Sequence, residues 1–111
     1  MKDYSTNWIK DEFLTYLFIY CINADYKESK KEIALVKTKT SYAFFDKMHD
    51  EFELDSDYAS LQKIIGAHNR LGYSSENTEE LFNSIKELFL TDGKYDIEER
   101  NLLMYLKHLL K

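Results

Sequence analysis

The fold is decided by the stretch Phe13-Leu14-Thr15-Tyr16-Leu17-Phe18-Ile19-Tyr20-Cys21-Ile22, which is apolar at almost every position. A helix built from these residues is apolar around nearly its whole circumference, which is typical of a central, buried helix. A membrane span needs about 20 apolar residues, and the charged residues Lys10, Asp11 and Glu12 directly precede this stretch. We therefore predict a buried helix over 7–24 rather than a membrane span or the apolar core of a signal peptide.

The composition favours one helical domain. In a chain of 111 residues a second core would leave each half very small, so we expect residues 1–111 to form a single domain. The sequence holds 3 glycines and no proline, which disfavours the many turns of a β-sandwich. The formal net charge of -5 is opposite in sign to that of a general nucleic-acid-binding protein, so no direct nucleic-acid binding is expected.

Apolar residues recur at helical spacing in four further segments. The first of these, 29–53, is either one long helix or two shorter ones divided at Thr38-Lys39-Thr40-Ser41, which is poor helix material. The others span 57–71, 78–90 and 97–110. No strand-like alternation competes with them, so the sequence predicts an all-α fold, a compact bundle of five to seven helices.

Capping residues mark several of the predicted helix ends. Ser56 is expected to cap the helix over 57–71 and Gly72 to end it, while Asn77 is expected to cap the helix over 78–90. Gly66 lies inside the helix over 57–71, where glycine costs about 1 kcal/mol relative to alanine. We expect a second helix to approach closely at Gly66, because such an approach would offset that cost.

Cys21 is the single cysteine of the chain. An intrachain disulfide and a cysteine-rich zinc site are therefore both excluded. Its place in the apolar stretch predicts a small, buried thiol. The lack of disulfides fits a reducing cytoplasm, which is the location we expect.

Two predicted helix junctions resemble one another. Residues 22–33 read I-N-A-D-Y-K-E-S-K-K-E-I, and residues 89–100 read F-L-T-D-G-K-Y-D-I-E-E-R. An offset of 67 residues aligns three polar pairs: Asp25 with Asp92, Ser29 with Asp96, and Glu32 with Glu99. An apolar helix is expected before and after each junction, so the sequence predicts two pseudo-repeated helix-loop-helix junctions.

Helix capping explains part of this repeat. Ser29 and Asp96 are suited to cap the helices that follow, and the two aligned glutamates fall in the first turn, near the positive end of the helix dipole. Capping does not explain Asp25 or Asp92, because a carboxylate at the carboxyl end of a helix meets the negative end of the dipole. A lysine, a free amide of the loop or a cation has to offset that cost.

The phrase Thr91-Asp92-Gly93-Lys94-Tyr95-Asp96-Ile97-Glu98-Glu99-Arg100, which follows an apolar helix, resembles the TerB-like family. The similarity covers both junctions and the helical order of most of the chain. It implies one TerB-like helical domain over residues 1–111 that binds a divalent cation (calcium, manganese or zinc) and no organic cofactor. The ligands that the resemblance implies are the four acids of the junctions, Asp25, Glu32, Asp92 and Glu99.

The two junctions differ in ways that bear on cation binding. Tyr26 stands where the family pattern has glycine. The first junction carries three acids and three lysines and is neutral, whereas the segment 92–99 carries a net charge of minus three. Capping and salt bridging are the alternative role for the same carboxylates.

A second group of acids lies in the middle of the chain, with Lys47 as the only basic residue among them. The plain interpretation is a solvated helix end and loop. The sharper interpretation is an acidic docking surface for a basic protein partner, because complementary charge steers association. The residues of this run are Asp46, Asp50, Glu51, Glu53, Asp55 and Asp57.

Nothing in the sequence indicates nucleophilic catalysis, because the serines lie in predicted caps and loops and Cys21 lies in an apolar helix. No enzymatic activity is therefore expected. The resemblance implies a binding domain that docks to partner proteins, with or without a peripheral membrane complex, in a stress or phage-defence response. The alternatives are a small acidic inhibitor or immunity-type protein that blocks a basic partner surface, and a purely structural adaptor.

Overall fold

Six α-helices make up the part of the chain that the computed structural model describes, which is residues 4–23, 30–40, 42–90 and 97–110. Within these ranges there is no strand, which confirms the predicted all-α bundle. No described helix combines the length and the hydropathy that a membrane span needs. The helices are α1 Lys10–Ile22, α2 Lys30–Lys39, α3 Tyr42–Leu54, α4 Asp57–Arg70, α5 Ser75–Phe89 and α6 Ile97–Leu109.

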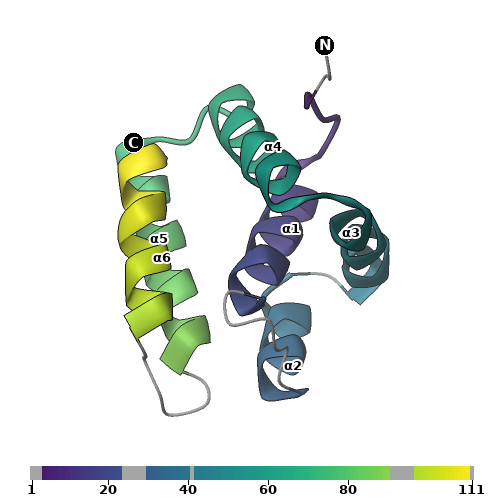
Figure 1. The fold of residues 1–111 in the computed structure, drawn as a ribbon, viewed down its shortest axis with the longest axis horizontal. Coiled ribbons are helices and arrows are strands. Elements are labelled where there is room, and N and C mark those ends of the chain that lie inside the picture. Colours follow the sequence, from purple (N-terminus) through teal and green to yellow (C-terminus); the bar gives the residue numbers. More distant parts are fainter. Residues whose placement is uncertain (1–3, 24–29, 41, 91–96, 111) are drawn as a thin grey trace.

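Helix α1 lies at the centre of the arrangement and contacts α2, α3, α4 and α5 (Figure 1). Helices α5 and α6 form an antiparallel pair on one side of α1, and α3 lies on the other side (Figure 1). Helix α4 crosses the amino-terminal half of α1. The radius of gyration is 13.0 Å, close to the value of about 13 Å that a compact chain of this length has.

The apolar stretch of α1 forms the middle of the hydrophobic core. Phe13, Tyr16, Leu17 and Ile19 are completely inaccessible to solvent, and Cys21 is 1% exposed. Both the buried central helix and the buried thiol that the sequence predicts are therefore confirmed. Aromatic rings from other segments pack around α1, among them Phe52 of α3, whose ring lies edge-on to that of Tyr16.

The segment 29–53 divides into two helices at the threonine-rich stretch. The Thr38 hydroxyl donates to the carbonyl of Leu35, and the Thr40 hydroxyl donates to the carbonyl of Val36, each at 2.8 Å. Side-chain hydroxyls of this kind compete with backbone amides for carbonyls and favour helix ends. Of the two possibilities that the sequence left open, the structure therefore has two helices, α2 and α3.

Serine side chains cap α4 and α5. The Ser56 hydroxyl accepts from the backbone amide of Ala59, as predicted. The predicted start of the helix over 78–90, at Thr78 with Asn77 as its cap, is wrong. Ser74 is the cap and accepts from the amide of Asn77, so α5 begins at Ser75. Residues 75–77 are polar and exposed, which is why the apolar periodicity begins one turn after the helix does.

The two described glycines play different roles. Gly72 follows the last residue of α4 with φ of +68°, a left-handed conformation that glycine adopts without strain, so it ends the helix as predicted. The expected close helix approach at Gly66 is wrong. Gly66 is exposed, and a Cβ atom built there meets nothing within 4 Å.

We expect Gly66→Ala to stabilise the protein by about 0.5–1 kcal/mol, because alanine restricts the unfolded chain and fits the helix without a clash. The matched control is Gly72→Ala, where a Cβ atom also meets open space but φ is positive. This second substitution should destabilise the protein by about 1 kcal/mol. Urea unfolding followed by circular dichroism measures both effects. Destabilisation by Gly66→Ala would show that the site has a packing role that the structure lacks.

Candidate metal centre at the two helix junctions

The two junctions have the same length in the structure as in the sequence alignment. Helix α1 ends at Ile22 and α5 ends at Phe89, while α2 begins at Lys30 and α6 begins at Ile97. Both pairs are separated by 67 residues, the offset that aligns the junction sequences. The repeat is therefore a repeat of helix boundaries as well as of residues. The predicted ligands Asp25 and Asp92, and the predicted caps Ser29 and Asp96, lie outside the described residues.

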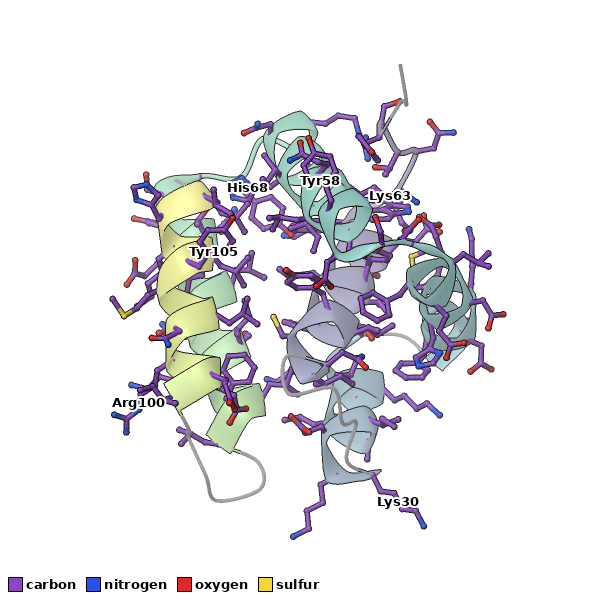
Figure 2. The ribbon with its side chains drawn as sticks, viewed as in Figure 1. Lys30, Tyr58, Lys63, His68, Arg100 and Tyr105 are labelled. Carbon is purple, nitrogen blue, oxygen red and sulfur yellow. The ribbon has the colours of Figure 1, made fainter. Side chains whose placement is uncertain are left out.

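Both aligned glutamates are buried. Glu32 is 7% exposed and Glu99 is 9% exposed, and each is the third residue of its helix. The neighbouring residues of these helix starts, Lys30 and Arg100, point away from the body of the protein (Figure 2). A carboxylate in the first turn benefits from the positive end of the helix dipole. That benefit offsets part of the cost of removing the charge from water.

The charges of the two glutamates influence the same buried thiol from different halves of the protein. Burial raises the pKa of Cys21 well above its ordinary value, and the negative charges of Glu32 and Glu99 raise it further. The first turns of α2 and α6 lie toward the same end of the molecule as the carboxyl end of α1 (Figure 1). The helix contacts agree, since α1 contacts α2 and α5, and α5 in turn contacts both α2 and α6.

Two buried carboxylates are half of the predicted ligand set. Among the described residues, no group of three or more histidine, cysteine, aspartate or glutamate side chains is placed to hold a metal ion. All four predicted ligands are carboxylates. The donors in this region are therefore carboxylate oxygens, which suit calcium, magnesium or manganese better than zinc.

Two of the acids in the central run face inward. Lys63 of α4 reaches across to α3 (Figure 2) and lies 3.0 Å from Glu51 and 2.8 Å from Asp55. Burial alone would lower the pKa of Lys63, but the hydrogen bonds to Asp55 and Glu51 outweigh burial and raise it. Asp55 also accepts a 2.6 Å hydrogen bond from the hydroxyl of Tyr16. Glu51 and Asp55 thus tie α3 and α4 to α1.

The other four acids of that run lie on the surface. Asp46, Asp50 and Glu53 are exposed on α3, and Asp57 is exposed in the first turn of α4. The Nδ1 atom of His49, one turn earlier, lies 3.2 Å from a carboxylate oxygen of Glu53. Any docking to a basic partner along this run therefore depends on these four carboxylates, which are a smaller set than the sequence suggested.

The sequence did not indicate the partners in three polar interactions of the structure. Glu12 is 7% exposed, accepts from the backbone amide of Ile9 at 3.0 Å and lies 2.6 Å from the ammonium group of Lys47. His68 lies between α4 and α5 (Figure 2), where it shares a 3.0 Å hydrogen bond with Thr78. Arg70 donates to the carbonyl of Trp8. The one local signal was the position of Glu12, three residues after the cap of α1.

The contribution of Glu12 to the stability of the protein can be tested by its dependence on pH. The hydrogen bond from Lys47, and then that from the amide of Ile9, hold the pKa of Glu12 below its ordinary value. A carboxyl group whose pKa is lower in the folded state stabilises the protein above about pH 4.5, and that contribution disappears as the pH falls through the folded-state pKa. We expect Glu12→Gln to be less stable than the wild type at pH 7. The difference should shrink below about pH 4.5.

The matched control is Glu79→Gln. Glu79 occupies the position of α5 that corresponds to Glu12 by the 67-residue offset, but it is exposed. Thermal unfolding at several pH values measures both variants. A stability difference for Glu12→Gln that stays constant from pH 7 to pH 3 would contradict the ion pair as its cause.

No family model, curated protein or solved structure matches this chain. The resemblance to the TerB-like family therefore rests on the two junction sequences. It remains a prediction. The burial of Glu32 and Glu99 at matching positions of α2 and α6 is a separate observation that does not depend on it.

Proposed function

We propose that this protein is a non-enzymatic binding domain that holds a divalent cation between its two helix junctions. Glu32 and Glu99 supply two carboxylate ligands, and Asp25 and Asp92 supply the others from the segments that precede α2 and α6. The cation links the two halves of the protein. By resemblance to the TerB-like family, the loaded domain docks to partner proteins in a stress or phage-defence response.

The observation that carries this proposal is the burial of two equivalent carboxylates, Glu32 and Glu99, each at the third position of its helix. A buried carboxylate loses its hydration, which costs free energy. Helix dipoles offset part of that cost. A divalent cation would offset much more of it, because it takes several carboxylate oxygens at once.

The donor chemistry favours calcium or manganese among the candidate cations. Carboxylate oxygens are hard ligands, which suit these ions. Zinc prefers sites that include thiolate or imidazole.

We expect calcium or manganese to raise the unfolding temperature of chelator-treated protein by several degrees, because a ligand that binds only the folded state stabilises it. Isothermal titration calorimetry gives the affinity directly. Glu32→Gln and Glu99→Gln should each weaken binding at least about tenfold, since each removes one charged ligand. The matched control is Glu98→Gln, which neutralises the adjacent exposed carboxylate in the same turn of α6.

Two results would overturn the cation proposal. One is that saturating calcium and manganese change neither the unfolding temperature nor the heat of titration. The other is that Glu98→Gln weakens binding as much as Glu99→Gln does. In either case, helix capping would be the role of the two buried glutamates.

A second candidate function is favoured by the surface of α3. This function is that of an acidic inhibitor or immunity-type protein that blocks a basic partner surface. Four carboxylates of the central run are exposed, and Leu54 beside them is 89% exposed. Apolar side chains within a charged rim are typical of docking surfaces.

Neutralisation of the exposed acids tests this second function. The variant carries Asp46→Asn, Asp50→Asn, Glu53→Gln and Asp57→Asn, and it leaves Glu51 and Asp55 in place because they hold the core together. Pull-down from the source cell should recover a basic protein with the wild type and at least about tenfold less with the variant, because the steering charge is removed. Recovery by the variant that equals that of the wild type would rule this function out.

A further inference from the structure

A cavity of about 490 Å³ lies between the amino end of α5 and the carboxyl end of α6, which are neighbours in this antiparallel pair (Figure 1). Its floor is formed by the buried side chains of Thr78, Phe82 and Leu110. Tyr73, from the connection between α4 and α5, adds an aromatic wall. Protein sites for small molecules have volumes of about 300–1,000 Å³ and mostly apolar walls. The cavity therefore has the size and the floor of such a site.

Two opposite charges lie at the mouth of this cavity. Lys107 of α6 and Glu79 of α5 both line it, and both are exposed. In the part of the chain that the structure describes, neither forms an ion pair or a hydrogen bond, with the other or with any other residue. The ammonium group of Lys107 lies 6.0 Å from the centre of the Phe82 ring, a contact that gives its three N–H donors no oxygen acceptor. One opening thus presents an ammonium group and a carboxylate that are both open to a ligand.

The wall of the cavity holds a hydrogen-bond donor that the protein does not use. The hydroxyl of Tyr73 is buried and has no hydrogen-bond partner among the described residues. Burial, and then the negative charge of Asp11, raise the pKa of Tyr73 to about 12, so the hydroxyl keeps its proton at neutral pH. Most buried polar side-chain atoms have a partner. This hydroxyl is therefore a second indication that the cavity takes an occupant with polar atoms.

The charges at the mouth restrict the class of ligand. Lys107 attracts a simple anion but Glu79 repels it, and a simple cation meets the reverse. A head group that carries both an ammonium group and a carboxylate matches both charges at once. The floor favours an apolar group, because apolar surface gains free energy when it leaves water. A free amino acid with an apolar side chain combines these two parts.

We propose that this cavity binds a free amino acid with an apolar side chain, such as leucine or phenylalanine. The carboxylate of the ligand pairs with Lys107 and its ammonium group pairs with Glu79. Its side chain packs against Phe82 and Leu110. The cavity lies at the opposite end of α5 and α6 from the junction that joins them. The amino acid therefore binds whether or not the junctions hold a cation.

An NMR titration of the backbone amide signals with leucine and with phenylalanine, in the presence of chelator, tests this site independently of cation binding. The signals of residues around the cavity, such as Thr78 and Phe82, should shift with a dissociation constant of roughly 1 mM or lower. Isocaproate is leucine without its amino group, and isopentylamine is leucine without its carboxylate. Each should bind at least about tenfold more weakly than leucine, because each leaves one charge of the mouth without its partner.

Single substitutions assign the two ends of the ligand. Glu79→Gln should weaken leucine binding at least about tenfold but should not weaken isocaproate binding, because isocaproate has no ammonium group for Glu79 to bind. Lys107→Met should likewise weaken leucine binding and spare isopentylamine binding. The matched control is Glu76→Gln, which neutralises an exposed carboxylate of α5 outside the cavity and should bind leucine like the wild type. The amide spectrum of each variant checks that it is folded.

Three results would contradict amino-acid binding at this cavity. The first is that neither leucine nor phenylalanine shifts the amide signals up to roughly 10 mM. The second is that isocaproate or isopentylamine binds as tightly as leucine, which would show that the mouth does not recognise both charges. The third is that folded Glu79→Gln and Lys107→Met bind leucine like the wild type, which would place the binding elsewhere.

Discussion

Nine of the thirteen residues of α1 are buried, and they lie on all sides of the helix. One neighbour can cover only one side of a helix, so α1 needs several. Helices α2, α3, α4 and α5 supply this cover, and the polar links of the core follow from it. Glu12 and Tyr16 of α1 pair with Lys47 and Asp55 because α3, and the connection from α3 to α4, pack over that side.

The two halves of the pseudo-repeat differ in how far their first helices, α1 and α5, are covered by other helices. Helix α5 corresponds to α1, yet it is covered on fewer sides. The side of α1 that meets α3 includes Glu12, Tyr16 and Tyr20, and the positions that correspond to them in α5 are Glu79, Asn83 and Glu87. All three of these are exposed. The polar residues on this side of α5 therefore fit a side that faces solvent, whereas the corresponding side of α1 is covered by α3.

The two junctions are alike, although the faces of α1 and α5 differ. The helix ends and starts match at 67 residues, and a buried glutamate occupies the third position of α2 and of α6. A buried carboxylate is costly unless its surroundings compensate for the charge. The presence of this glutamate at the same position in both halves is one shared feature of the two junctions. This is why the cation proposal involves both junctions together.

The sequence by itself determined the helical class, the central helix, the buried thiol and the repeat, because apolar periodicity and local capping are written in neighbouring residues. The sequence misplaced the start of α5, because the first turn of that helix is polar and shows no apolar periodicity. It gave Gly66 a packing role, because the sequence does not show whether another helix lies opposite a given residue. It also could not separate Glu51 and Asp55 from the exposed acids around them. Only the tertiary structure decided which acids face inward, because Lys63 and Tyr16 reach their partners across the chain through packing of helices.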